Sequence, residues 1–182
     1  MVARRKISAS FANFDSEITR LLALDTQNQT RYRAGPGRPN ASVITTTQLH
    51  IITEGVFNRA FRSFESFLEE VFVLYSMEKR SRGGRHSLAY ISPKSNEHAI
   101  QMMQSGMNFL QWNSPDTIIQ RAELYLKDGF PIKESITINR TILRDVRHVR
   151  NHIAHNSRDS QAKFNTRAVQ PGLFNAVCVR GF

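Results

Sequence analysis

Hydrophobic residues recur at steps of three and four along most of the chain, which is the period of an amphipathic α-helix. The longest pattern of this kind covers residues 45–79, where apolar side chains fall on more than one side of the expected helix. A helix that is apolar on several sides must be covered on those sides by other elements. We therefore expect residues 45–79 to form the long central helix of a bundle.

Shorter patterns of the same period lie on both sides of this segment. Residues 8–26 predict a helix before it, and residues 96–111 predict a third helix after it. The Ser-Pro-Asp sequence at 114–116 is typical of a helix start, and the helix that follows should end at Gly129. A last core-facing helix is predicted from apolar residues at steps of four, four, three and four: Ile138, Ile142, Val146, Val149 and Ile153.

The segments between these helices are basic and rich in glycine and proline. Residues 27–42 interrupt the helical period and are expected to be a loop or linker. Residues 79–95 form a second basic connection with one Arg-Gly-Gly sequence, and a single copy favours a solvated loop over an RNA contact. Residues 158–169 predict a final polar helix, and residues 171–182 a short strand or an extended tail.

Alternating strand patterns are nearly absent, so the fold class expected is all-α, a helical bundle with an irregular N-terminal extension. A chain of 182 residues suits a single core. We divide it into an N-terminal helix with a basic linker (1–44), a helical domain (45–168) and a C-terminal tail (169–182).

Charge and composition restrict the partners. The chain has 25 Lys and Arg against 15 Asp and Glu, a net charge of +10. Such a field attracts polyanions, of which nucleic acid is the partner we favour; a basic surface kept for solubility, or one neutralised by an acidic partner, is the alternative. Cys178 is the only cysteine, which suits a reducing cytoplasm. No apolar run approaches the roughly 20 residues that span a bilayer, so no membrane partner is expected.

The candidate chemistry lies at residues 147–157, RHVRNHIAHNS, within the last predicted core helix. Successive residues of a helix turn by about 100°, which places Arg150 about 70° to one side of the apolar stripe. Arg150 and His155 are about 140° apart on this helix, so they do not lie on one line. The same flank carries four polar side chains: Arg147, Arg150, Asn151 and His155.

Three interpretations of this stretch compete. The first is an ordinary basic surface helix with solvated histidines. The second is a metal site, because His148, His152 and His155 follow the i, i+4, i+7 spacing that can converge on one cation. No cysteine ligand is near in sequence, and Arg147 and Arg150 would repel a cation, so no metal is expected. The third is a phosphate site, where arginine binds oxygen atoms and histidine transfers protons.

The sequence RNHIAH (150–155) resembles the R-x4-6-H motif of the HEPN superfamily, in which a polar residue follows the arginine. Arg150, Asn151 and His155 match the motif residue by residue. In HEPN domains the motif lies on a late helix of an α-helical bundle, as it is expected to here. Residues 56–75 are also similar to an early core helix of toxin-like members, and the likeness covers about residues 45–168.

The resemblance implies a metal-independent endoribonuclease without a cofactor. Members of the superfamily are often toxins of toxin–antitoxin pairs or effectors of antiphage defence, and they usually act as homodimers in which two motifs form one cleft. An antitoxin or another regulatory partner is compatible with that class, and the sequence does not show whether one controls this chain. The alternative is a non-catalytic HEPN module that binds RNA or protein, and such a module would not depend on His155.

The residues fit RNA cleavage on chemical grounds as well. RNA carries its own nucleophile, the 2′-OH, so the protein needs a proton acceptor, a proton donor and a positive charge at the phosphate. His155 suits proton transfer and Arg150 suits charge stabilisation. Asn151 would orient His155 or bind the phosphate, and Arg147 and His152 are possible supporting residues. The RNA that would be cut does not follow from the sequence.

Two acidic residues of the central helix complete the candidate set. Glu65 and Glu69 stand at i and i+4, where like charges repel each other unless a cation lies between them. One interpretation pairs them with Arg62 on the same face. The functional interpretation is that one of them orients Arg150 or Arg147.

Overall fold

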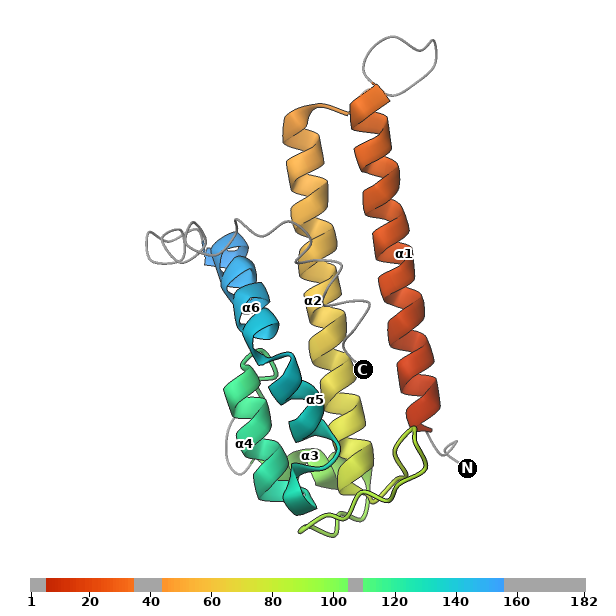
Figure 1. The fold of residues 1–182 in the computed structure, drawn as a ribbon, viewed down its shortest axis with the longest axis vertical. Coiled ribbons are helices and arrows are strands. Elements are labelled where there is room, and N and C mark those ends of the chain that lie inside the picture. Colours follow the sequence, from red (N-terminus) through yellow and green to blue (C-terminus); the bar gives the residue numbers. More distant parts are fainter. Residues whose placement is uncertain (1–5, 35–43, 105–109, 156–182) are drawn as a thin grey trace.

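The computed structural model describes residues 6–34, 44–104 and 110–155. These residues contain α-helices, one 3-10 turn at Lys127–Gly129 and two isolated β-bridges, with no strand among them, so the predicted all-α class is confirmed. Figure 1 shows two long antiparallel helices with the shorter ones gathered beside the second. The helices are α1 (Ile7–Ala34), α2 (Thr46–Ser76), α3 (Asn96–Gln104), α4 (Pro115–Tyr125), α5 (Ile132–Ile138) and α6 (Arg140–His155).

Helix α2 is the long helix that the sequence predicts, and it contacts α1, α3 and α6. A capping box fixes its start: the Gln48 N–H donates to the Thr45 hydroxyl oxygen at 3.2 Å, and the Thr45 N–H donates to the Gln48 side-chain oxygen at 2.9 Å. Fourteen of its residues are buried, on several sides of the helix. The prediction of a helix covered by neighbours on more than one side is therefore confirmed.

Helix α1 is longer than predicted and packs along α2 over its length (Figure 1). The prediction that residues 27–42 form a loop is wrong for residues 27–34, which continue the helix. No glycine or proline interrupts the chain there. The side chains of Asn28 and Thr30 donate hydrogen bonds of 2.8 Å to the carbonyl groups of Leu24 and Thr26 one turn earlier, so these polar residues are accommodated within the helix.

The main core surrounds the C-terminal half of α2. Leu68 and Phe72 are fully buried, and the first half of α1 joins this core through Phe11 and Phe14, whose rings lie 4.9 and 4.6 Å from the Phe67 ring. Residues of α3 to α5 and their connections cover the other side: Ala99, Met103, Trp112, Ile118, Ala122, Leu126, Ile132 and Ile136. No helix in the three described ranges is both long and apolar enough to cross a bilayer.

The last predicted helix corresponds to α6, which begins at Arg140, while Ile138, the first residue of the predicted stripe, ends the short helix α5, which the sequence did not predict. The Asn139 side chain donates to the Ser135 carbonyl at 2.9 Å and so satisfies one of the last carbonyl groups of α5. The Asn139 carbonyl then accepts from Leu143 at 2.9 Å in the first turn of α6. The prediction that Ile138 faces the core is wrong, since 76% of it is exposed; Leu143, 6% exposed, faces the core instead.

The remaining helix boundaries agree with the sequence in part. Pro115 is the first residue of α4, as the Ser-Pro start predicts. The prediction that this helix ends at Gly129 is wrong, because α4 already ends at Tyr125, and Gly129 is the last residue of the separate 3-10 turn, where it adopts the left-handed conformation (φ 71°). Leu110 and Gln111 lie outside any helix, so the third helix does not reach residue 111. The helix expected at 158–169 and the tail at 171–182 fall outside the described residues.

Candidate functional site

Helix α6 holds most of the candidate residues and lies against α2 on the side away from α1 (Figure 1). Its residue Val146 packs with Phe57 and Phe61 of α2 in a small buried cluster. Ile142, Val149 and Ile153 pack against this cluster but are only partly buried, because α6 has neighbours on few sides. The apolar stripe predicted for this helix is confirmed at these positions, although Ile153 is not in a closed core.

Arginines recur on α6 at steps of four, three and three: Arg140, Arg144, Arg147 and Arg150. At the first end of this row, Arg140 and Arg144 both pair with Asp116 of α4, with the Arg144 Nη2 atom 2.9 Å from the Asp116 Oδ2 atom. Hydrogen bonds from Arg144 and Arg140 lower the pKa of Asp116 and keep it ionised. The carboxylate therefore compensates part of the positive charge at this end.

The other end of the row lacks such compensation. Neither Arg147 nor Arg150 forms an ion pair with a carboxylate in the described part of the chain. The Arg150 guanidinium lies over the Phe61 ring, 5.9 Å from its centroid, and its Nη1 atom donates to the Asn151 Oδ1 atom at 3.3 Å. The Nε atom of Arg147 is buried without a hydrogen-bond partner among the described residues. Two half-buried positive charges thus lie side by side near the end of α6.

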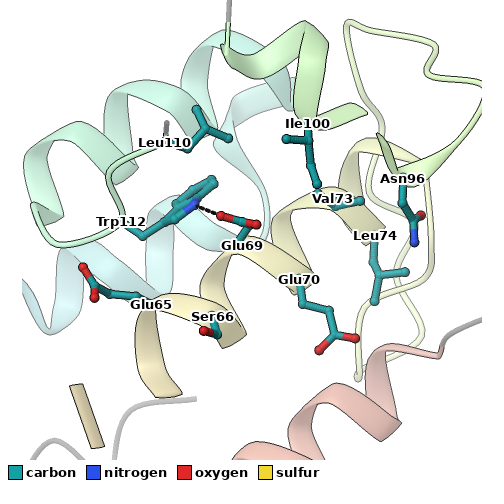
Figure 2. Close-up of a pocket in the computed structure, with 10 residues that line it drawn as sticks. All are labelled: Glu65, Ser66, Glu69, Glu70, Val73, Leu74, Asn96, Ile100, Leu110 and Trp112. Atoms are coloured by element: carbon teal, nitrogen blue, oxygen red, sulfur yellow. Dashed lines mark hydrogen bonds between the residues drawn. The ribbon is translucent and has the colours of Figure 1, made fainter. Parts of the chain in front are cut away.

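Glu65 of α2 is the acidic residue that lies near this end of α6. Burial raises the pKa of Glu65 above its ordinary value of 4.5, while the positive charges of Arg150 and Arg62 oppose the shift. Glu69, one turn later, accepts a hydrogen bond from the Trp112 indole N–H at 2.8 Å (Figure 2). Of the two glutamates in the candidate set, Glu65 interacts with Arg150, and Glu69 is held by Trp112.

The histidines are placed less completely than the arginines. Asn151 and His152 lie half-buried on α6, directly after Arg150. His155 is the last residue of α6, and its side chain falls outside what the structure describes. Among described side chains, which include His148 and His152 but not His155, no three His, Cys, Asp or Glu groups converge to hold a metal ion. The structure thus brings together Arg147, Arg150, Asn151 and Glu65, and does not place the His155 imidazole.

A cavity of about 450 Å³ opens beside Glu65, between α2, α3 and the chain before α4 (Figure 2). Three carboxylates line it, from Glu65, Glu69 and Glu70, together with the Trp112 ring. Such an acidic wall disfavours phosphate groups, so this cavity does not suit a nucleic acid. Neither the cavity nor the role of Trp112 was predicted from the sequence, in which three glutamates within residues 65–70 were the one signal available.

No protein-family model matches this sequence, and no curated protein or solved structure is significantly similar to the chain. The resemblance to the HEPN superfamily therefore depends only on the motif at 150–155, on the similarity at 56–75 and on the chemistry of the residues around them. Family membership and activity are proposals on that basis.

Proposed function

We propose that this chain is a metal-independent endoribonuclease of the HEPN type, which needs no cofactor and acts as a homodimer. The observation that supports it most is the pair of half-buried arginines near the end of α6, neither of which forms an ion pair with a carboxylate among the described residues. There Arg150 is held by Phe61 and Asn151 within the RNHIAH sequence, and the Nε atom of Arg147 is buried without a hydrogen-bond partner among those residues. The net charge of +10 would draw RNA toward such a surface.

In the proposed reaction the ribose 2′-oxygen attacks the adjacent phosphorus atom. The 2′-O–P bond forms, the P–O5′ bond breaks, and the products are a 2′,3′-cyclic phosphate and a 5′-hydroxyl end. A base takes the proton of the 2′-OH, and an acid gives a proton to the leaving 5′-oxygen. His155 would serve as one of these two groups, since its imidazole exchanges protons near neutral pH.

Arg150 would stabilise the extra negative charge of the pentacoordinate phosphate. A guanidinium suits this role because it stays charged and binds two oxygen atoms at once. Its contact with Phe61 restricts its rotamers before RNA arrives, which lowers the entropic cost of binding. Glu65 attracts Arg150 from α2 without forming an ion pair with it, so the guanidinium remains available to a phosphate.

The dimer is proposed because Arg150 and His155 lie about 140° apart on one helix, which is unfavourable for acting on one phosphate. In a two-fold dimer, Arg150 of one chain would act with the His155 of its mate. The half-buried residues Ile142, Val149 and Ile153 give α6 apolar surface that such a partner would cover.

We further propose that the protein is a toxin or antiphage-defence effector of the cytoplasm, where its activity would be restrained by an antitoxin or another regulatory partner. An acidic partner would neutralise the excess of ten positive charges and cover the α6 surface. The second candidate function is a non-catalytic RNA-binding module. The unpaired charges of Arg147 and Arg150 favour it, because they could bind phosphates without any help from His155.

The test compares RNA cleavage by the wild type and three variants in the presence of EDTA. His155→Ala should lower the rate by about 10²–10⁴-fold with RNA binding retained, as expected for the loss of a general acid or base. Arg150→Ala should lower both cleavage and binding. Arg140→Ala is the matched control, since this arginine belongs to the same row but is paired with Asp116, and it should cleave like the wild type.

The alternatives give different results. RNA binding without cleavage by the wild type would favour the binding module. Cleavage that is lost in EDTA and restored by zinc would instead make His148, His152 and His155 metal ligands.

A further inference from the structure

A second cavity, of about 300 Å³, lies between the start of α1, the C-terminal half of α2, the basic loop after α2 and the first part of α5, and no described residue of α6 lines it. This volume is at the lower end of the range for small-molecule sites. Four aromatic rings line it, from Phe11, Phe67, Tyr75 and Phe130. No carboxylate lines this cavity, in contrast to the acidic cavity beside Glu65.

The basic loop at one edge of the cavity has a defined shape. An antiparallel bridge between Arg80 and His86 closes it, and the Ser81 N–H donates to the Arg85 carbonyl at 2.8 Å. Gly84 turns the chain in the left-handed conformation (φ 80°), and its N–H donates to the Ser81 carbonyl at 2.9 Å. This turn brings Arg82 and Arg85, three residues apart, to the same cavity.

Both guanidiniums lie on aromatic rings of the cavity wall. The Arg85 Cζ atom is 4.3 Å from the Phe130 ring centroid, and the Arg82 Cζ atom is 5.7 Å from the Phe11 ring centroid. These cation–π contacts keep the two charges close to the apolar wall. Neither arginine forms an ion pair with a carboxylate among the residues that the structure describes. An apolar recess therefore has two uncompensated positive charges at its edge.

We propose that this cavity binds a small organic anion with an aromatic body, whose ring enters between Phe11, Phe67 and Phe130 while its anionic group contacts Arg82 and Arg85. Charge and shape both favour such a ligand over a neutral or a cationic one. Tyr75 also lines the cavity, and burial raises the pKa of its hydroxyl, which stays neutral and adds no negative charge to the wall. This binding does not depend on RNA cleavage.

Two fluorescent probes that differ in charge alone test this site. Both 8-anilinonaphthalene-1-sulfonate and N-phenyl-1-naphthylamine carry the same ring system, and only the first carries a sulfonate. Titration of the full chain should show that the sulfonate binds more tightly than the neutral amine. The double variant Arg82→Gln with Arg85→Gln should bind the sulfonate about tenfold or more weakly and leave binding of the neutral amine unchanged.

The matched control removes two positive charges elsewhere. Arg31→Gln with Arg33→Gln alters the far end of α1, about 30 Å along the helix from Phe11, and should bind both probes like the wild type. Ser135→Leu, which fills the cavity from α5, should weaken both probes.

Three results would overturn the proposal. The first is a wild type that does not bind the sulfonate, and the second is equal loss of sulfonate binding in both double-arginine variants. The third is a double variant of Arg82 and Arg85 that binds the sulfonate normally but has lost RNA binding, which would assign these arginines to RNA.

Discussion

The contact between Phe61 and Arg150 joins the stability of the fold to the candidate site, and it leads to a quantitative prediction. Phe61 is 5% exposed, packs against Val146 and carries the Arg150 guanidinium on its ring. Phe61→Leu keeps an apolar side chain but removes the aromatic face. Repacking costs about 1–1.5 kcal/mol, and the lost cation–π contact adds about 0.5–1 kcal/mol. We expect the free energy of unfolding to fall by about 1.5–2.5 kcal/mol.

A double-mutant cycle isolates the part of this loss that belongs to the contact. Urea unfolding, followed by circular dichroism, is measured for Phe61→Leu, for Arg150→Gln and for the combination. The two substitutions should be coupled by about 0.5–1 kcal/mol. A control cycle combines Phe61→Leu with Arg140→Gln. Arg140 lies ten residues before Arg150 on α6, about 15 Å away, so the coupling in this cycle should be near zero.

Coupling of less than about 0.3 kcal/mol between Phe61 and Arg150 would refute the reasoning, because substitutions at distant, independent sites already deviate from additivity by that amount. The guanidinium would then not be held on the ring in solution, and the restriction of its rotamers could not contribute to phosphate binding.

Three other measurements address the fold, the electrostatics and the assembly. The raised pKa of Glu65 means that the folded state loses stability as the pH rises from the ordinary pKa of 4.5 through the raised value. Glu65→Gln removes this loss. The free energy of unfolding in urea, taken relative to the wild type, should therefore be higher for the variant at pH 7 than at pH 4. An equal difference at both pH values would contradict the assignment. On α5, Ile136→Ala should cost about 2–5 kcal/mol while Ile138→Gln should stay within about 0.5 kcal/mol, since the first side chain is fully buried and the second 76% exposed. Light scattering at micromolar concentration should give twice the 20.8 kDa chain mass, and Val149→Asp should give the monomer; a fully active monomeric wild type would rule out the composite site.

The sequence predicts those elements whose signals are local and repeated. Helix α2 follows from an apolar period of three and four that recurs through residues 45–79. The Thr45 and Gln48 capping pair at its start is a further local signal, which the sequence-based prediction did not use. The start of α4 follows from Pro115, which is compatible with the first helical turn. Each of these patterns determines the backbone of its own segment, so it can be interpreted without knowledge of the three-dimensional fold.

The helix boundaries that were predicted wrongly lie where the apolar period carries no information about where a helix ends. Asn139 ends α5 by one hydrogen bond to Ser135, and a helical period that continues across it hides the break. Residues 27–34 carry no apolar period, yet they remain helical because nothing in them stops α1 before Gly35.

The candidate residues come from the sequence, and their contacts come from the structure. Spacing places Arg150 on a flank of the last core helix, and Glu65, one of the two glutamates considered as its partner, interacts with it. Spacing could not show that Phe61 carries the Arg150 guanidinium, or that Trp112 holds Glu69. Both contacts join residues more than 40 positions apart in sequence, and only the packing of the helices brings them together.

The central claim is that the protein cleaves RNA through the ribose 2′-OH, and one comparison tests it most directly. An RNA that the wild type cuts at a mapped position is synthesised again with a single 2′-deoxy nucleotide on the 5′ side of that bond. The account predicts that the deoxy RNA binds with the same affinity and is not cut there, because the nucleophile is missing. Cleavage of the deoxy RNA at that bond, at the rate of the parent RNA, would contradict the account.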